Sequence, residues 1–128
     1  MTKGLADTSV FIARESGRAL DVVRLPDELA VSVITVGELR AGVLAASDPV
    51  TRDRRLATLT HALVMGPAPV DEPVAEAWAR LRILLRDRGQ RMSVNDSWIA
   101  ATAMALGVPL VTQDLEYVDL PDLDVVQV

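Results

Sequence analysis

Three reactive side chains are absent or nearly absent from this 128-residue sequence. It contains no cysteine, which excludes disulfide bonds, thiol nucleophiles and zinc–thiolate sites. His61 is the only histidine and Lys3 is the only lysine. A metal site built on a pair of histidines is therefore excluded, and any metal chemistry has to use oxygen-bearing side chains.

Aromatic residues and long apolar stretches are also scarce. Aromatic residues make up 3% of the chain although 50% of it is hydrophobic, so the core has to be built from aliphatic side chains. No apolar run approaches the roughly 18 residues of a membrane span. The first residues also lack the apolar core of a secretion signal. We therefore expect a soluble, cytoplasmic protein that makes no membrane contact.

Positively charged residues are also fewer than negatively charged ones, with 13 Lys and Arg against 18 Asp and Glu. The formal net charge is −5, so the whole chain is not a polycation that attracts nucleic acid over long distances. A nucleic-acid substrate would need local arginine patches and a bound cation.

The length of the chain predicts a single domain that spans residues 1–128.

Short apolar runs alternate with helical segments along the chain, which is typical of an α/β sandwich with a mostly parallel sheet. We expect strands within residues 4–9, 29–34, 109–112 and 125–128, and a strand or extended linker at 65–70. The apolar spacing predicts helices over residues 10–20, 35–46, 52–64, 73–88 and 95–106. Gly89 and Gly107 supply stop signals for the last two helices.

Four acidic residues occupy related positions in this pattern. Asp7 and Asp114 follow predicted strands, whereas Glu38 and Asp96 lie near the starts of predicted helices. In a parallel sheet, strand ends and the following helix starts face one edge, so these four carboxylates should converge. Converging carboxylates repel each other unless a cation is present. Oxygen ligands favour Mg²⁺, with Mn²⁺ as the alternative, and such an ion suits the hydrolysis of a phosphodiester.

Each of these acids also has a purely structural interpretation. Asp7 and Asp114 could each belong to a turn, and Asp96 could favour the helix dipole in a first turn. Glu38 could close a capping box with Thr35 as the helix cap. We expect Asn95 to cap the helix that follows it. The joint placement of the four acids on one edge favours the functional interpretation.

Four sequence elements together resemble the PIN-domain proteins, and within them the VapC type of bacterial and archaeal toxin. The resemblance covers nearly all of the chain. It is carried by Asp7-Thr8-Ser9-Val10-Phe11-Ile12, by Ser32-Val33-Ile34-Thr35-Val36-Gly37-Glu38-Leu39-Arg40-Ala41-Gly42, by Asn95-Asp96-Ser97-Trp98-Ile99-Ala100-Ala101-Thr102-Ala103, and by Leu110-Val111-Thr112-Gln113-Asp114.

The resemblance implies a PIN-like three-layer sandwich, with a short, mostly parallel central sheet flanked by helices. It also implies a metal-dependent endoribonuclease with Asp7, Glu38, Asp96 and Asp114 as its catalytic acids. We expect Asp7, Asp96 and Asp114 to approach the metal and Glu38 to act mainly through water. The resemblance further implies a homodimer, a cognate antitoxin protein, and tRNA or ribosomal RNA as the substrate.

One feature departs from the family pattern. The family usually carries a Phe a few residues after the fourth acid, where this chain has Leu115-Glu116-Tyr117-Val118-Asp119. Asp119 is therefore an alternative to Asp114. The competing function is a catalytically weak, PIN-like module that binds RNA or a protein, and the presence of all four acids argues against it.

Several other side chains have two interpretations. Thr8, Ser9 and Thr112 lie beside the acids in the sequence and could orient a carboxylate or a phosphate. The arginines at positions 52, 54, 55, 82 and 86 form either a solvated surface or phosphate contacts. Trp78 and Trp98 fit core or dimer packing, and we expect His61 to be structural or exposed.

Overall fold

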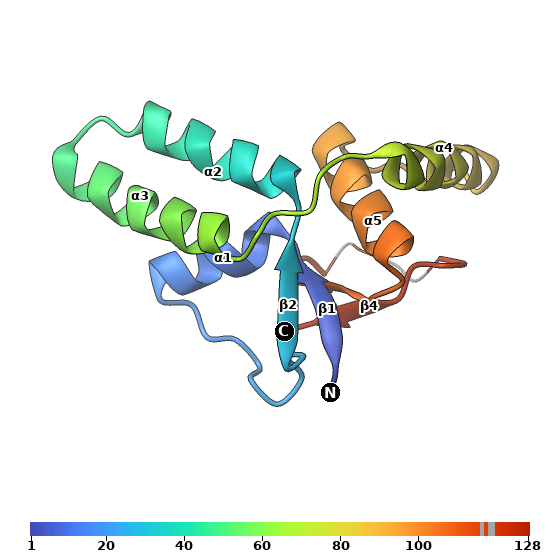
Figure 1. The fold of residues 1–128 in the computed structure, drawn as a ribbon, viewed down its shortest axis with the longest axis horizontal. Helices are drawn as coiled ribbons and strands as arrows, with labels where there is room; N and C mark the ends of the chain where they lie inside the picture. The colour runs from blue at the N-terminus through green and yellow to red at the C-terminus, as the bar shows by residue number, and fades with distance from the viewer. Residues whose placement is uncertain (116, 118–119) are drawn as a thin grey trace.

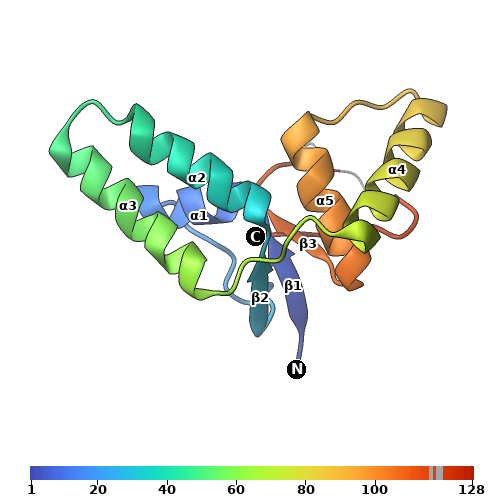
Figure 2. The same ribbon diagram turned by 45° about the horizontal axis from the view of Figure 1, so that its top comes forward.

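A computed structural model of the chain describes residues 1–115, 117 and 120–128. Its elements follow in the order β1 (Lys3–Ala6), α1 (Thr8–Ser16), β2 (Glu28–Val31), α2 (Val33–Ala45), α3 (Pro49–Val64), α4 (Glu72–Asp87), α5 (Val94–Leu106), β3 (Leu110–Thr112) and β4 (Val125–Gln127). Figures 1 and 2 show α2 and α3 as an antiparallel pair on one side of the strands, with α4 and α5 on the other. None of the helices within the described chain is long and apolar enough to cross a membrane.

The four strands form one parallel sheet in the order β2-β1-β3-β4. The chain moves outward from β1 to β2 on one side and later returns to place β3 on the other side of β1. This arrangement creates a switch point at the carboxyl ends of β1 and β3, where open α/β sheets bind their ligands. The predicted fold class, an α/β sandwich with a parallel central sheet, is confirmed.

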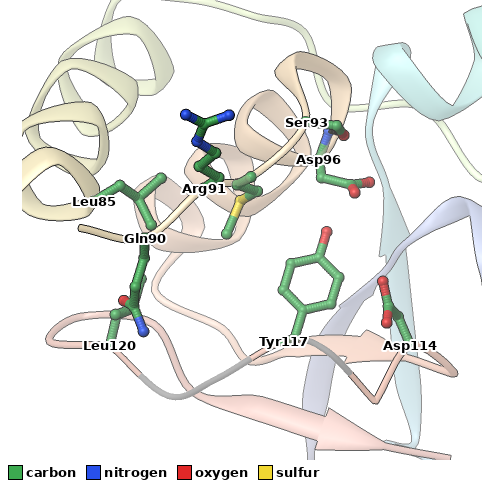
Figure 3. Close-up of a pocket in the computed structure, with 9 residues that line it drawn as sticks. Leu85, Gln90, Arg91, Ser93, Asp96, Asp114, Tyr117 and Leu120 are labelled. Carbon is green, nitrogen blue, oxygen red and sulfur yellow. Dashed lines mark hydrogen bonds between the residues drawn. The ribbon is translucent and has the colours of Figure 1, made fainter. Parts of the chain in front are cut away.

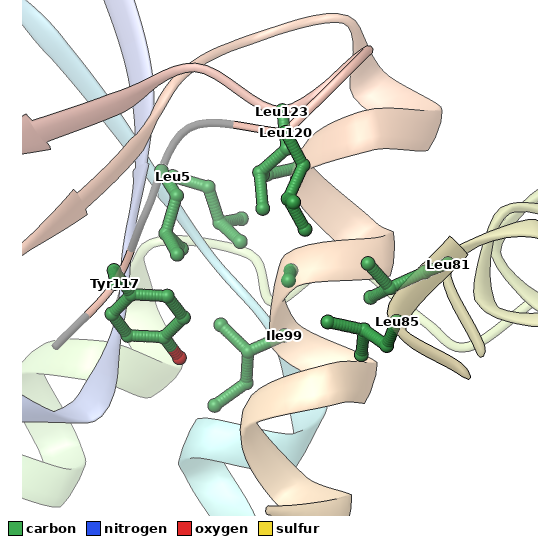
Figure 4. Close-up of a cluster of buried hydrophobic side chains, with 10 residues drawn as sticks. Leu5, Leu81, Leu85, Ile99, Tyr117, Leu120 and Leu123 are labelled. Carbon is green, nitrogen blue, oxygen red and sulfur yellow. The ribbon is translucent and has the colours of Figure 1, made fainter. Parts of the chain in front are cut away.

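Alternating side chains along the two central strands build a core on each face of the sheet. Leu5 and Leu110 pack with Ile99 of α5 and Leu81 of α4, in the cluster that Figure 4 shows. The next residue on each strand, Ala6 or Val111, points to the opposite face and packs with side chains of α1, α2 and α3. Because both faces are covered, the middle of each central strand is apolar, and the molecule has three layers.

The segment between α3 and α4 was expected to be a strand or an extended linker, and it is extended. It makes one parallel bridge, between Ala68 and Ser32 at the end of β2. The backbone N–H of Ala68 donates to the carbonyl of Val31, and the N–H of Val33 donates to the carbonyl of Ala68. This linker therefore continues the edge of the sheet for one residue and no further.

Helix boundaries differ from the expected ones mainly at the amino-terminal ends. The first helix begins at Thr8 because Asp7 caps it, and it ends at Ser16, before Gly17, which has a left-handed backbone with φ of 75°. The sequence had suggested a start at residue 10 and an end at residue 20. The segment after β1 thus turns directly into a helix, which fixes Asp7 at the junction of the two elements.

The close approach of β1 to its neighbours predicts a stability difference between two glycine substitutions. A Cβ atom on Gly4 would lie 2.7 Å from Cγ2 of Val111 and 2.9 Å from Cγ of Pro26. We expect Gly4→Ala to destabilise the protein by about 1–3 kcal/mol through overpacking. Gly37 lies within α2 with open space around its Cα. Gly37→Ala should therefore stabilise the protein by about 0.5–1 kcal/mol.

Urea unfolding of both variants and of the wild-type protein measures this difference. Gly37→Ala is the matched control, because it adds the same methyl group where nothing is displaced. Equal unfolding free energies for the two variants would contradict the strand packing described above.

Candidate active site

Asp7 lies at the carboxyl end of β1, and the protein holds its carboxylate with hydroxyl groups. Its Oδ1 accepts hydrogen bonds from the backbone N–H of Ser9 at 3.0 Å and from Oγ of Ser9 at 2.5 Å. Its Oδ2 accepts a hydrogen bond from Oγ1 of Thr112 at 2.5 Å. The Ser9 hydroxyl in turn accepts from the backbone N–H of Gln113 at 2.9 Å. The two central strands are thus joined at their carboxyl ends through this one carboxylate.

The negative charge of Asp7 is buried without a positive partner. The side chain is 4% exposed, and it forms no ion pair with any described residue. Burial raises the pKa of Asp7, and the charge of Asp96 raises it further, whereas the hydrogen bonds from Ser9 and Thr112 act in the opposite direction. The penalty of burying the charge is larger than the stabilisation by the hydroxyl groups. This carboxylate is therefore suited to receive a cation.

Asp114 follows β3 and is tied to the same hydroxyl group. Its backbone N–H donates to Oγ1 of Thr112 at 2.9 Å, so Thr112 bonds the Asp7 carboxylate and the Asp114 backbone at once. The side chain of Asp114 borders a cavity that Asp96 borders from α5, as Figure 3 shows. The alternative fourth acid, Asp119, lies outside the described residues.

Asp96 lies in the first turn of α5, as expected, but the helix cap is not the predicted residue. Ser93 caps α5, and its Oγ accepts from the backbone N–H of Asp96 at 3.2 Å. The helix begins at Val94, so Asn95 belongs to its first turn and the prediction of an Asn95 cap is wrong. Ser93 provides the same kind of acceptor two residues earlier. Asp96 is therefore favoured by the helix dipole and also faces the cavity.

Glu38 is held by a hydrogen bond from another element, and not by a capping box. The helix α2 begins at Val33 with Ser32 as its cap, so Thr35 lies inside the helix and the capping-box interpretation is wrong. The hydroxyl of Thr8, at the start of α1, donates to Oε1 of Glu38 at 2.6 Å. The hydroxyl of the fully buried Thr35 lies 3.0 Å from that of Thr8. The first turn of α1 thus orients the carboxylate of Glu38.

The fold brings three of the four acids toward one place. The pKa of the Tyr117 hydroxyl is raised by burial and by the negative charges of Asp96, Asp7 and Asp114. Glu38 lies on the other side of Thr8 and borders separate hollows, one of which also includes Asn95. Within the described part of the chain, no three acidic or histidine side chains are close enough together to hold one ion.

The chemistry of the donors nevertheless fits a hard cation. All of the candidate ligands are carboxylate oxygens, and the most buried of them lacks a counter-charge among the described residues. Oδ1 of Asp7 uses both of its lone pairs in the two bonds from Ser9, but Oδ2 accepts only from Thr112. One lone pair of Oδ2 is thus free among the described contacts, and an ion could use it.

The hydrogen bonds of Thr8, Ser9 and Thr112 confirm the role predicted for these residues, which is to orient a carboxylate. Thr8 positions Glu38, and Ser9 with Thr112 positions Asp7, in each case through a side-chain hydrogen bond. Sequence analysis did not identify Gln90 or Arg91, which border the cavity beside Asp96. It noted Tyr117 only as a departure from a family pattern. The spacing of the sequence carries no signal for the first two, because they belong to the irregular turn after α4.

The tryptophan and histidine residues have the structural roles expected of them. The rings of Trp78 and Trp98 stack with centroids 4.3 Å apart and an angle of 3°. The indole N–H of Trp78 donates to Oγ of Ser97 at 3.0 Å, and the guanidinium of Arg82 lies 4.9 Å from the ring centroid of Trp78. His61 is exposed on α3 and lies away from the acids. The stacked tryptophan rings and the hydrogen bond from Trp78 to Ser97 join α4 to α5.

Two of the arginines considered for phosphate binding stabilise a helix pair. A side-chain nitrogen of Arg55 donates to the carbonyl of Gly42 at 2.7 Å, and one of Arg52 donates to the carbonyl of Ala46 at 3.0 Å. Both carbonyls belong to the last turns of α2 or to the residue that follows. The arginine cluster at the start of α3 therefore satisfies orphan carbonyls of the preceding helix.

Comparison with known proteins identifies the family. The chain matches the PIN domain family model over residues 5–123. It is 50% identical over 117 residues to "Ribonuclease VapC5" of Mycobacterium tuberculosis, an alignment that covers 91% of this chain and 87% of that protein. It is 49% identical over 127 residues to "Ribonuclease VapC4" of the same organism, with 98% and 97% covered.

A solved structure agrees with these sequence relatives. The crystal structure of VapBC-5 from Mycobacterium tuberculosis, a member of the VapBC family of toxin-antitoxin systems, superposes with a TM-score of 0.87 at 42% identity. The superposition covers 100% of both chains. The family match, the relatives and the acids at the ends of two central parallel strands agree with one another. The chain belongs to the PIN-domain family.

Proposed function

We infer that this chain is an endoribonuclease that acts as the toxin of a toxin–antitoxin pair. The observation that carries the inference is the buried Asp7 carboxylate, which has no ion-pair partner among the described residues and whose pKa is raised further by the charge of Asp96. The cost of burying this charge exceeds the stabilisation by the hydrogen bonds that it accepts, which favours a cation-binding active site over a binding module. The relatives that are about half identical to this chain are named ribonucleases, which supports the same reaction.

We propose Mg²⁺ as the cofactor, with Mn²⁺ as the alternative, and Asp7, Asp96 and Asp114 as the residues that would hold it. When bound, such an ion activates water and stabilises negative charge on a phosphoryl oxygen. Asp7 is positioned for this role because Ser9 and Thr112 fix its two oxygens. Glu38, held by Thr8, presents a fixed carboxylate that can accept a proton from water.

The first prediction from this proposed function concerns cleavage of RNA. We expect Asp96→Asn to lower the rate of magnesium-dependent cleavage at least a hundredfold, which is about 2.7 kcal/mol of activation free energy, because the amide keeps the shape but removes the charge. Gel analysis of a labelled tRNA or ribosomal RNA fragment, with magnesium or with EDTA, measures the rate. Glu76→Gln is the matched control, since Glu76 is exposed on α4 and, among the described residues, forms an ion pair only with Arg80.

Cleavage at the wild-type rate by Asp96→Asn would exclude Asp96 from the site. If the wild-type protein cleaves equally well in EDTA, the proposal of a magnesium cofactor is wrong, although the ribonuclease activity would stand.

We propose a cognate antitoxin protein as the principal partner. Apolar side chains are exposed on α2 and α3, among them Leu44, Val50 and Val64, and the chain carries a net charge of −5. An antitoxin segment with an apolar face and a basic side chain would match both features. We propose a homodimer on the family resemblance, which sedimentation of the purified chain would test.

The second prediction concerns the growth of bacteria that express the chain. Expression of the wild-type chain alone should slow growth, because uncontrolled cleavage of tRNA or ribosomal RNA stops protein synthesis. Co-expression of the small protein encoded beside it should restore growth. Asp96→Asn at the same verified expression level should not slow growth. Unimpaired growth with active wild-type protein would count against the toxin role, even if cleavage is observed in vitro.

A further inference from the structure

A cavity of about 360 Å³ opens beside Asp96 and Asp114. Its walls come from three parts of the chain: the end of α4 with the turn after it, the start of α5, and the segment after β3. Figure 3 shows the ring of Tyr117 standing between the two acids on one side and Gln90 with Arg91 on the other. The cavity therefore continues the acidic site in one direction, toward α4.

Tyr117 places a buried hydroxyl group in this cavity without a hydrogen-bond partner. The residue is 9% exposed, and its ring packs in the core cluster with Leu5 and Ile99. Its Oη is inaccessible and no described residue satisfies it with a full hydrogen bond, although the Asp96 side chain lies near enough to raise its pKa through a hydrogen bond. In Figure 3 this hydroxyl points into the cavity toward Asp96. Buried hydroxyl groups are rarely left unpaired in folded proteins, so whatever occupies the cavity, water or a ligand, is expected to pair with this one.

Gln90 contributes a second buried group of the same kind. Its Oε1 is also inaccessible and also lacks a partner among the described residues. Gln90 and Tyr117 come from segments 27 residues apart in the chain, yet both border the one cavity. Two unpaired polar groups at one cavity require a ligand with hydrogen-bonding groups of its own.

The remaining walls narrow the chemistry of that ligand. Leu85, Met92 and Leu120 supply apolar surface, whereas Arg91 is exposed at the rim. A nucleobase combines flat apolar faces with a hydrogen-bonding edge, and its phosphate would lie near the guanidinium. A free sugar or an aliphatic amino acid lacks the flat apolar face.

We propose that this cavity binds the base of a nucleotide next to the scissile phosphate, and that the Tyr117 hydroxyl and the Gln90 carboxamide recognise its edge. This proposal rests on the inference that the chain cleaves RNA. Both residues are positioning residues: they set the affinity for the substrate and the preference for one base, and they take no part in bond cleavage.

Cleavage kinetics with single-atom variants test the proposal. Tyr117→Phe removes only the hydroxyl and should raise KM about three- to tenfold for the preferred RNA, with kcat changed by about twofold or less, as expected for one neutral hydrogen bond. Gln90→Leu should act in the same direction, and both variants should reduce the preference between oligonucleotides that differ only in the bases beside the cut. Thr102→Val is the matched control, because it removes a buried hydroxyl elsewhere in α5 that donates to the carbonyl of Trp98.

Binding can be measured without cleavage, because Tyr117 is the only tyrosine in the chain. Protein labelled on tyrosine gives one set of ring signals by NMR, which can be titrated with each of the four ribonucleoside 5′-monophosphates. We expect at least one of them to shift these signals saturably, and Gln90→Leu to weaken that binding.

The outcomes separate the two proposals. If the wild-type chain cleaves RNA but Tyr117→Phe and Gln90→Leu both match Thr102→Val in KM and base preference, the nucleotide site is wrong and the ribonuclease stands. A melting temperature that falls in Tyr117→Phe with KM unchanged assigns the hydroxyl a structural role and also overturns the nucleotide site. Saturable nucleotide binding at Tyr117 without cleavage under any metal condition supports the site and overturns the ribonuclease.

Discussion

The structure depends on one buried carboxylate at the junction of its two central strands. Asp7 caps α1, accepts three hydrogen bonds and receives one of them from Thr112 on the neighbouring strand. These contacts hold the carboxyl ends of β1 and β3 together. They do not neutralise the charge, since the pKa of Asp7 is raised by burial in spite of them. The buried charge therefore has an electrostatic cost at this position.

The positions of the other three acids follow from the order of the same strands. Because β1 lies between β2 and β3, residues that follow each of these strands reach the same edge of the sheet. Asp114 arrives there after β3, and Glu38 arrives on the helix after β2, where Thr8 of α1 holds it. Asp96 comes from α5, which packs across the core that contains Leu5. Each acid is therefore placed by an element whose own position depends on the central strands.

The raised pKa of Asp7 also links the site to stability. A group whose pKa is higher in the folded than in the unfolded protein stabilises the folded state most at low pH. For Asp7, that contribution is complete below the ordinary aspartate value of 3.8 and is lost as the pH rises through the folded pKa. Above its folded pKa the Asp7 carboxylate carries the cost of the buried charge, and the proposed cation would remove part of that cost.

Sequence analysis predicted the order of the elements and the parallel sheet, because apolar periodicity and glycine stops are local signals. It misplaced the caps: Thr35 and Asn95 are common cap residues, but Ser32 and Ser93 precede them and cap the helices first. It also suggested that Thr8, Ser9 and Thr112 orient carboxylates, and the hydrogen bonds confirm this.

The cavity that adjoins the acids could not be predicted. Gln90 lies in a turn without periodicity, and the burial of Tyr117 results from packing against distant residues such as Leu5 and Ile99. The roles of the acids in catalysis and metal binding stay predictions, because hydrogen bonds and burial establish position and charge alone. Their functional assignment needs a measurement in the presence of the ion.

The most direct test of the account is the pKa of Asp7 with and without magnesium. The carboxyl carbon of Asp7, assigned by comparison with Asp7→Asn, can be followed by NMR as the pH is varied. In EDTA we expect a pKa above the ordinary value of 3.8, and with saturating Mg²⁺ we expect it to fall, because the ion favours the charged form. A pKa at or below 3.8 in EDTA that magnesium leaves unchanged would contradict the claim that this buried charge awaits a cation.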